Sequence, residues 1–360
     1  MRKATTGITS QVLLIATIAN TTAQPFPFKN KRENDSYAHL SVLCREAGME
    51  LFIAHYANLQ DNAQILAWSE VAGQWVCGHY PLSSFTLSYA DLPQNFIAAN
   101  TLRLALQQHA INIVNPLALS DLCTDKLASY KRWPHLLAPT FLLGEIHLSN
   151  KIDQIQNCSD LNCTELILKP RFGERGKGIH IINRQALDSL DSSSYKDYIV
   201  QPLINTQTGI PALGINGRHD LRLIMAQGKV VQVYARIPPV DSWISNTAHG
   251  GTIHYYEPNV LPVRILNFAE AIDEELSHFS PRVYSIDIGI APSGRIWVYE
   301  LNTMPGIVWN ASCQSDIQKN KEMHQVITDV MYTALYAGTS NPDRHREKIM
   351  SGSSQVRSEK

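Results

Sequence analysis

One short stretch, Ser285–Gly306, constrains the fold of this chain more than any other. Apolar residues alternate with small or polar ones from Ile286 to Ile290, a pattern typical of a strand with one polar face. The turn residues Pro-Ser-Gly follow, and a second strand is predicted from Arg295 to Leu301. The sequence therefore predicts that the two strands fold back on each other as a hairpin.

Three oxygen-bearing side chains are expected to meet on this hairpin. Glu300 and Asn302 are two residues apart, so they lie on the same face of their strand. The turn brings Asp287 opposite them. Two carboxylates and an amide oxygen suit a hard cation such as Mg²⁺, held together with substrate phosphates. An isolated pair of carboxylates is more often a solvated surface feature, so the metal interpretation depends on residues upstream.

A second motif lies in the segment KPRFGERGKGIHII, between two predicted strands. Glycines let backbone N–H groups approach a phosphate closely, and basic residues are interleaved with them. Lys169, at the end of the preceding strand, can reach the same phosphates. On its own, a glycine-rich turn between strands is more often structural. Together with the carboxylate hairpin, it favours a nucleoside triphosphate site.

Composition limits the choice of partners. The chain has 360 residues and a mass of 40.3 kDa, enough for two or three packed units. Its net charge of −1 and pI of about 6.9 give no reason to expect a nucleic-acid partner. No apolar run is long enough for a membrane span. The six cysteines form no CxxC pair, which favours reduced thiols over a zinc site.

The order of elements predicts an α/β protein. Strands alternate with helices up to about residue 120, which indicates a mostly parallel, Rossmann-like sheet without the G-x-G-x-x-G fingerprint. A helix is expected over residues 121–133, followed by a strand-like segment over 136–143. Further predicted elements are the hairpins Trp68–Pro81 and His219–Arg236, the strand Tyr198–Ile204 and the helices Phe268–His278 and Ile317–Tyr336.

With these motifs in order, the chain resembles the ATP-grasp superfamily, and within it the glutathione synthetase and RimK-type carboxylate–amine ligases. The resemblance covers about residues 110–312 and lies in the segments TDKLASYKRW with APTF, LILKPRFGERGKGI, YIVQPLI, HDLRLIMAQGKVVQVYARIPP, WISNTAHGG and SIDIGIAPSGRIWVYELNTMPG. Each segment is weakly specific alone, and their combination in this order is specific.

The resemblance implies an ATP-grasp fold, α/β with an α+β C-terminal half. It implies an N-terminal Rossmann-like pre-ATP-grasp domain over residues 1–120, a small lid subdomain over 121–200, a large subdomain with the metal site over 201–337, and a disordered tail over 338–360.

The resemblance also implies roles for individual residues. The expected ATP-binding residues are Lys126, Lys169, Gly173, Arg175, Gly176, Gly178, Gln201 and the backbone of Leu203. The expected metal ligands are Asp287, Glu300 and Asn302, and the expected catalytic residues are Arg236, Arg222 and Asn246. Arg222 has an equally weighted alternative, a structural ion pair with Asp220.

The implied activity is ATP-driven ligation of a carboxylate to an amine through an acyl phosphate. The implied cofactors are ATP and two Mg²⁺ ions, for which Mn²⁺ can substitute. The expected substrates are a small-molecule or peptide carboxylate and an amine. Alternatives are a phosphotransferase that forms no amide and a non-catalytic nucleotide-binding module. The substrates and the oligomeric state are not determined by these motifs.

Two departures from the family pattern leave contacts open. The segment INTQTGIP after Gln201 carries no acidic residue for the ribose hydroxyls. The segment SYADLP lacks the arginine that relatives often carry there.

Four further side chains have two interpretations each. Trp243 and Trp309 could line a substrate pocket or pack in the core, and His249 and His254 could serve as a catalytic base or be solvated loop residues.

The apolar run Val12–Ala19 has two interpretations. It could be part of a signal peptide, because Arg2 and Lys3 precede it, or a first buried strand over residues 11–19. The run is short and is interrupted by Thr17, and an ATP-dependent enzyme needs an ATP supply. We therefore expect the strand, and with it a cytoplasmic location.

Overall fold

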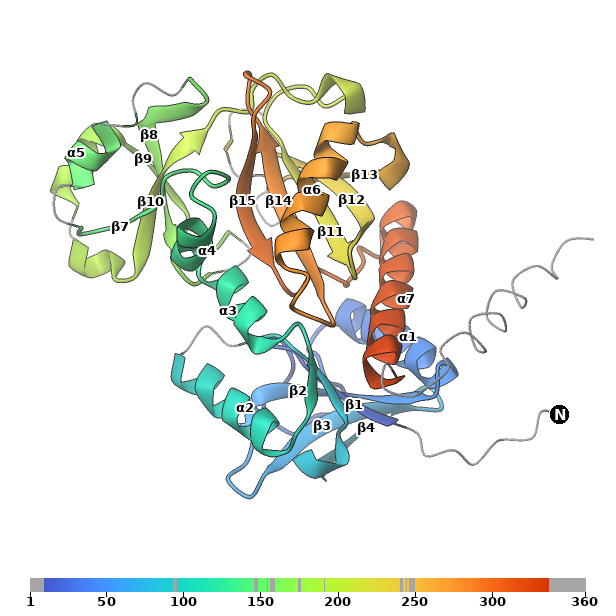
Figure 1. The fold of residues 1–360 in the computed structure, drawn as a ribbon. Helices are drawn as coiled ribbons and strands as arrows, with labels where there is room; N and C mark the ends of the chain where they lie inside the picture. The colour runs from blue at the N-terminus through green and yellow to red at the C-terminus, as the bar shows by residue number, and fades with distance from the viewer. Residues whose placement is uncertain are drawn as a thin grey trace, which may run out of the picture.

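The computed structural model describes residues 10–92, 96–145, 148–153, 155, 159–173, 176–190, 192–239, 242–243, 245 and 250–336. In this part of the chain the strands form three sheets, of six, four and five strands (Figure 1). The two expected site residues Arg175 and Asn246, and also His249 and the tail 338–360, lie outside the described residues.

The first sheet has the strand order β4-β3-β2-β1-β5-β6. Its strands are β1 (Ser10–Ile15), β2 (Met49–Leu59), β3 (Gln64–Val71), β4 (Gln74–Pro81), β5 (Leu87–Ala90) and β6 (Asn112–Val114). Strands β2, β1, β5 and β6 are parallel, and the β3–β4 hairpin continues the sheet antiparallel. The expected first strand is confirmed over residues 10–15, in the middle of the sheet.

Both faces of β1 are buried, because helices cover both sides. Val12 and Leu14 pack in the cluster that includes α1 (Lys31–Glu46), and Leu13 and Ile15 in the cluster that includes α2 (Phe96–Gln108). A continuous apolar run is what such a strand requires. This burial explains why the run resembles the apolar part of a signal peptide.

The second sheet is small and has the order β7-β10-β8-β9, to the left in Figure 1. Its elements are β7 (Phe141–Leu142), β8 (Leu161–Pro170), β9 (His180–Asn183), β10 (Tyr198–Ile204) and the helix α5 (Leu148–Asp153). The predicted order of strand, glycine loop and strand is confirmed, since β8 and β9 pair antiparallel around the loop. The expected strand over residues 136–143 is reduced to the two residues of β7.

The predicted single helix over residues 121–133 is wrong. Two helices, α3 (Leu117–Thr124) and α4 (Lys126–Arg132), occupy this region and are separated at Asp125. The Asp125 carboxylate accepts hydrogen bonds from the backbone N–H groups of Leu127 and Ala128, as the N-cap of α4. An N-cap residue is non-helical, so the chain must break at this position.

The third sheet is antiparallel, with the order β13-β12-β11-β14-β15. It consists of β11 (Asp220–Ala226), β12 (Lys229–Ile237), β13 (Thr252–Tyr256), β14 (Val283–Ile290) and β15 (Ile296–Asn302), and α6 (Val263–Glu275) covers one face. The opening hairpin is confirmed as β14–β15, and Asp287 pairs with Glu300 as predicted.

The polar face predicted for β14 does not face solvent, because every residue of this strand is buried. Leu221, Leu223 and Ile286 pack toward α6 on one face of the sheet. Arg222 and Asp287 lie on the other face, and Asp287 is 0% exposed. The face of β14 opposite the isoleucines therefore carries one buried charged residue, Asp287.

The long helix α7 (Gln314–Tyr336) connects the third sheet to the first. It packs against α1, and its Met323, Ile327 and Met331 share a core cluster with residues of β1 and β11 (Figure 1). Strand β10 of the small sheet ends at Ile204. The domain boundaries at residues 120, 200 and 337 stay predictions.

Other local features complete the fold. Short 3₁₀ helices occur at Leu82–Ser84, Arg184–Ser189, Ser192–Tyr195, Pro211–Leu213 and Pro258–Val260. The five cysteines among the described residues are free thiols. Within the described ranges, none of the helices is both long and apolar enough to cross a membrane.

Candidate active site

A cavity of about 160 Å³ lies where the small sheet meets the third sheet. Most of the predicted site residues line it. From the small sheet and α4 these are Lys126, Lys169, Gly173, Gly176, Gln201 and Leu203, and from the third sheet Arg236, Asp287 and Glu300. The structure thus places residues from both halves of the motif series around one space. Their individual roles stay predictions.

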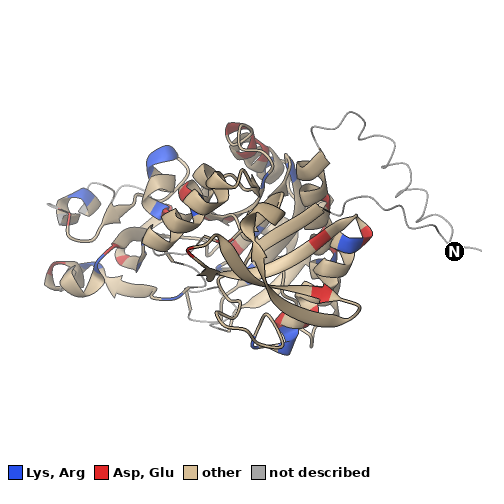
Figure 2. Cartoon of the chain, turned by 90° about the horizontal axis from the view of Figure 1, so that it is seen from below, with Lys and Arg blue, Asp and Glu red and all other residues tan. Residues whose placement is uncertain are grey.

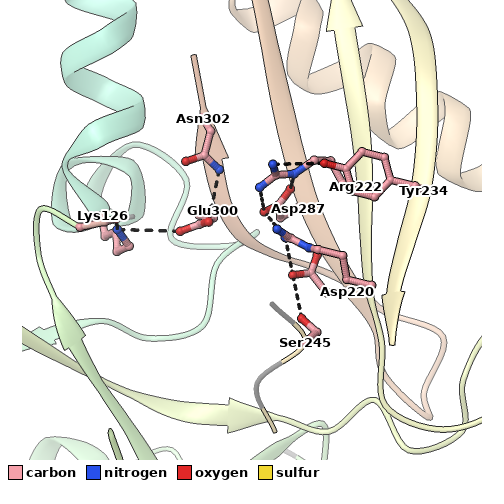
Figure 3. Close-up of polar contacts among 10 residues, drawn as sticks. Lys126, Asp220, Arg222, Tyr234, Ser245, Asp287, Glu300 and Asn302 are labelled. Atoms are coloured by element: carbon pink, nitrogen blue, oxygen red, sulfur yellow. Dashed lines mark hydrogen bonds and ion pairs between the residues drawn. The ribbon is translucent and has the colours of Figure 1, made fainter. Parts of the chain in front are cut away.

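Lys126 is positioned by the N-cap that begins α4. Arg171 donates to both oxygens of the capping Asp125, at 2.7 and 2.5 Å, which ties the helix start to the glycine loop. Lys126 is the first residue of the helix and its Nζ donates to the carbonyl oxygen of Gly173 at 2.7 Å. The Glu300 carboxylate lies 3.8 Å away from this Nζ (Figure 3).

Lys169 is a buried cation without a partner among the described residues. Its side chain extends from β8 and is 7% exposed. It forms no ion pair or hydrogen bond with any residue that the structure describes. The pKa of Lys169 is lowered to about 8, chiefly by burial; the Glu300 carboxylate opposes this shift and the Lys126 ammonium adds to it. An unpaired ammonium facing a cavity is suited to receive an anion.

The glycine loop needs glycine at two positions. Gly176 and Gly178 have φ angles of 71° and 70°, in the left-handed region that other residues rarely adopt. A Cβ atom on Gly178 would lie 2.6 Å from the Tyr198 hydroxyl and 3.0 Å from Pro170 Cγ. The loop is therefore packed closely onto its own strands.

The connection through β10 forms another wall of the cavity. Gln201 is buried, and its Nε2 donates to the hydroxyl of Thr140 at 2.6 Å. The pairing of β10 with β8 shifts register between Pro202 and Leu203, which is a bulge in this strand. Leu203 lines the cavity just after the bulge.

Two arginines and two aspartates form a network on the third sheet. Arg222 donates from Nε and Nη2 to the two oxygens of Asp287, each at 2.6 Å. Arg236 donates from Nη2 to Asp220 and Asp287, each at 2.5 Å. Ser245 donates to Asp220 at 3.2 Å (Figure 3). The alternative ion pair between Arg222 and Asp220 does not form, because Arg222 pairs with Asp287 and Asp220 pairs with Arg236.

Register explains this exchange of partners. Arg222 pairs with Asp287 across β11 and β14, while Asp220 pairs with Arg236 across β11 and β12. Burial raises the pKa of Asp220 to about 6, although Arg236 opposes the shift. Burial acts in the same direction on Asp287, but Arg222 and Arg236 outweigh it and hold the Asp287 pKa below its ordinary value.

Two atoms of this network have no hydrogen-bond partner in the described part of the chain. They are Asp220 Oδ1 and Arg236 Nε, both buried. Both residues also line the cavity. Unsatisfied buried polar atoms are unfavourable, so the network is suited to contact a bound molecule.

The predicted metal ligands differ in how well they fit an ion. Glu300 and Asn302 share one side of β15, with Glu300 Oε1 3.3 Å from Asn302 Nδ2, and the Glu300 side chain is 27% exposed. Their oxygens suit a hard cation. Asp287 is different, because both of its oxygens already accept from arginines. Among the described residues, no group of three or more His, Cys, Asp or Glu side chains is arranged to hold a metal.

The remaining candidates are two tryptophans and a histidine, and only one of them lines the cavity. Trp243 lines the cavity, as one of its two interpretations expected. Trp309 packs against the rings of His39 and His324 instead. His254 is an exposed residue of β13, 3.3 Å from the Thr252 hydroxyl.

Several lining residues were missed by the sequence motifs. They are Arg218, His219, Ser245 and Tyr299. Arg218 lies in the bend before β11, where strand alternation gives no indication of its direction. His219 Nε2 accepts from the backbone N–H of Ile290 at 3.1 Å, and its Nδ1 lies 3.0 Å from the Gly217 oxygen. Burial lowers the pKa of His219, which keeps this ring in its structural role.

Charged residues of both signs occur along the chain and in the cavity. Basic and acidic positions are interspersed across the view in Figure 2. In the cavity, three cationic side chains of the small sheet and α4, Lys126, Lys169 and Lys177, gather on one wall. The carboxylates of Asp220, Asp287 and Glu300 also line the cavity, so charges of both signs meet there.

Comparison with known proteins agrees with this geometry. Residues 140–334 match the model of the family described as YheC/D-like ATP-grasp. No curated protein matches the chain in sequence.

Solved structures share the fold at low sequence identity. A RimK-domain ATP-grasp protein from Sphaerobacter thermophilus has a TM-score of 0.55 and 15% identity, covering 89% of this chain and 99% of that one. A RiPP-associated ATP-grasp ligase of Chryseobacterium gregarium, in complex with ADP and a leader and core peptide, has a TM-score of 0.56 and 13% identity, covering 89% and 96%. D-alanyl-alanine synthetase A of Vibrio cholerae has a TM-score of 0.53 and 12% identity, covering 90% and 99%.

Proposed function

Because the chain belongs to the YheC/D-like ATP-grasp family, we propose that it is an ATP- and Mg²⁺-dependent ligase that joins a carboxylate to an amine. The observation that carries the proposal is Lys169, a buried ammonium without a partner among the described residues, beside the glycine loop and Lys126. A buried cation is unfavourable until an anion completes it. A polyphosphate is the anion that fits both a pair of lysines and a glycine loop.

In the proposed reaction an oxygen of the substrate carboxylate attacks the γ-phosphorus, and ADP leaves with the electrons of the broken P–O bond. The product is an acyl phosphate. The amine then attacks the acyl carbon, loses a proton and expels phosphate, so that an amide forms. Lys126 and Lys169 hold the phosphates that are not transferred. Arg236 contacts the transferred phosphoryl group and the oxyanion of the second step.

Arg222 has a positioning role in this proposal. It engages both Asp287 oxygens, and Asp287 in turn accepts from Arg236. Fixing Arg236 in advance lowers the reorganisation needed when charge develops. Asn246, expected as a catalytic residue, lies outside the described residues and keeps that proposed role on the resemblance alone.

Glu300 and Asn302 are the residues that would hold a divalent cation, with Asp287 adjacent on β14. Mg²⁺, or Mn²⁺ in its place, would neutralise phosphate charge there, and the family resemblance implies two ions. The glycine loop would exclude water, which otherwise hydrolyses an acyl phosphate.

The substrates we propose are an amino-acid or peptide carboxylate and an amine. The support is that similar structures include a ligase bound to peptide and a D-alanyl-alanine synthetase. The ATP requirement also favours a cytoplasmic location.

The test measures ADP release and product mass. The protein is incubated with ATP, Mg²⁺ and pools of amino acids and short peptides, with and without added amines. We expect amine-dependent ADP release and a product whose mass is the sum of acid and amine less one water. The exposed Lys229→Met variant is a control that should behave as the unmodified protein. ADP release without amine, together with a phosphorylated product, would favour the phosphotransferase alternative and contradict ligation.

A further inference from the structure

A stacked arginine–tryptophan pair on the cavity wall has no part in the mechanism above. The guanidinium carbon of Arg218 lies 3.6 Å from the centre of the Trp243 ring. Nη1 of Arg218 donates to the carbonyl oxygen of Ser242 at 3.4 Å. Stacking and hydrogen bond together fix the plane of the guanidinium, and both side chains line the cavity.

Among the described residues, no carboxylate pairs with Arg218. Its neighbours Arg222 and Arg236 are paired with aspartates, whereas Arg218 forms no ion pair with any residue that the structure describes. Its Nε is buried and has no acceptor among them. An N–H group in this condition is unfavourable, and an incoming oxyanion would supply the acceptor. Nε and Nη2 form the edge of the fork that binds an oxyanion bidentately.

The position of Arg218 indicates which part of an occupant it meets. The hydroxyl of Tyr299 donates to the carbonyl oxygen of His219 at 3.2 Å, and the His219 side chain contacts the backbone of Thr206. Arg218 thus lies beside the segment that follows β10. Glu300, by contrast, faces Lys126 at the end of β15.

In the proposed function, the adenine base of the nucleotide lies near Gln201 and Leu203, and the metal ion lies near Glu300 and Asn302. The phosphate closest to the sugar then falls on the side of Arg218. No acidic residue occurs between Gln201 and Asp220, so this segment carries no carboxylate that would pair with Arg218 or repel a phosphate.

We propose that Arg218, held flat against Trp243, binds the α-phosphate oxyanion of the nucleotide. This inference rests on the proposed function, because it takes a nucleotide as the occupant. It adds a third cationic contact to the two lysines and comes from the opposite wall of the cavity. Trp243 is a positioning residue in this proposal, since it acts by orienting the guanidinium.

The test compares nucleotide affinities by isothermal titration calorimetry. ADP, AMP and adenosine are titrated into the unmodified protein, Arg218→Gln and Arg295→Gln. Arg295 is a matched control, because its guanidinium carbon lies 3.7 Å from the centre of the Trp297 ring and neither residue lines the cavity. We expect Arg218→Gln to weaken ADP and AMP binding about 10- to 100-fold, the effect of one charge-assisted hydrogen-bonded contact. Adenosine affinity and all affinities of Arg295→Gln should stay within about twofold, far below the loss expected for a charged contact.

Trp243→Leu provides a second variant. It should weaken ADP binding less than Arg218→Gln does, because the cation remains but loses its orientation. Thermal melts of each variant check that the fold is retained.

The outcomes separate this inference from the proposed function. If the unmodified protein binds ADP and Arg218→Gln binds it equally well, the inference is overturned alone. A raised KM for the acid substrate in that case would assign Arg218 to the acid. Equal losses for adenosine and ADP would move the contact to the ribose and contradict the α-phosphate assignment. An unmodified protein that binds no nucleotide would overturn the proposed function together with this inference.

Discussion

The two walls of the cavity carry charge in opposite ways. On the wall of α4 and the small sheet, Lys169 has no partner among the described residues and Lys126 meets a carboxylate only at 3.8 Å. On the wall of the third sheet, Arg222, Arg236, Asp220 and Asp287 are joined at 2.5–2.6 Å. Both sets are buried, so desolvation acts on both, but only the second is compensated within the protein.

This difference separates two uses of buried charge. The uncompensated lysine wall is completed by a ligand, and the protein without ligand is less stable for it. The compensated arginine wall holds its geometry whether or not a ligand is present. Removing the charge of Lys169 and removing that of Asp287 should therefore change the free energy of unfolding with opposite signs.

The largest effect on stability is expected for Asp287→Ala. It leaves the buried guanidinium groups of Arg222 and Arg236 without their shared carboxylate, which should lower the free energy of unfolding by ~3–5 kcal/mol. Urea denaturation measures this change. Asp35→Ala is the control, because the exposed pair of Lys31 and Asp35 contributes ~0.5 kcal/mol or less. If Asp287→Ala is as stable as the control, the arginine wall is not a compensated network.

The opposite sign is expected for Lys169→Met. A shift of the Lys169 pKa from 10.5 to about 8 corresponds to ~3 kcal/mol of unfavourable burial, which the substitution removes. The unliganded variant should therefore be more stable at pH 7, by up to this amount, while ADP binding and turnover are lost. Lys229→Met is the matched control on an exposed lysine. A destabilised Lys169→Met protein would mean that Lys169 is already paired.

The pH dependence provides a separate check on Lys169. Between pH 8 and 10.5 the unfolded chain keeps the Lys169 proton, whereas the folded protein has lost it. The unfolded state binds more protons in this range, so the stability of the unmodified protein rises with pH. The advantage of Lys169→Met should be full below pH 8 and should shrink toward pH 10.5. An advantage that does not change with pH would contradict the assignment.

A smaller loss is expected in the glycine loop of the lysine wall. Gly178→Ala adds a Cβ atom 2.6 Å from the Tyr198 hydroxyl, at a φ of +70°. We expect a loss of ~2–3 kcal/mol in stability and weaker ADP binding, since the loop must move. Gly48→Ala is the control, because its φ is +82° but a Cβ there meets nothing within 4 Å. Equal losses in the two variants would mean that the loop packing carries no energy of its own.

The smallest change in stability is expected for Glu300→Gln. Glu300 is partly exposed and its contact with Lys126 is long, so stability should change by less than ~0.5 kcal/mol. The gain in ADP affinity that Mg²⁺ provides should nevertheless be lost. Calorimetric titration of ADP with and without Mg²⁺ measures it. An undiminished Mg²⁺ effect in Glu300→Gln would remove Glu300 from the metal site.

Much of the fold could be predicted because its signals are local. Alternation and turn residues predicted the β14–β15 hairpin, and strand period placed Asp287 opposite Glu300. Local patterns could not predict that both faces of β14 are buried, because a charged residue in a strand usually indicates a face exposed to solvent. Here the guanidinium group of Arg222, on β11, contacts the Asp287 carboxylate in place of water. That pairing depends on which strands are neighbours in the sheet.

The site shows the same division. The order of the motifs along the chain is sufficient to predict that Lys126, Lys169 and Glu300 share one site. The partners of Arg222 and Arg236 depend on the order β12-β11-β14, which no local pattern contains. The break at Asp125 was missed although its capping contacts with the N–H groups of Leu127 and Ala128 are local, because the apolar pattern continues across it; the ion pair with Arg171, far along the chain, could not be predicted from local sequence.

The central claim, ligation through an acyl phosphate, is tested most directly by following oxygen. The protein is incubated with ATP, Mg²⁺, an amine pool and amino acids or peptides whose carboxylates carry ¹⁸O. When the amine displaces phosphate from the acyl carbon, one carboxylate oxygen leaves with the phosphorus. We predict inorganic phosphate that contains one ¹⁸O atom for each amide formed, and none with Lys169→Met. Amide formation with unlabelled phosphate would contradict the acyl-phosphate mechanism.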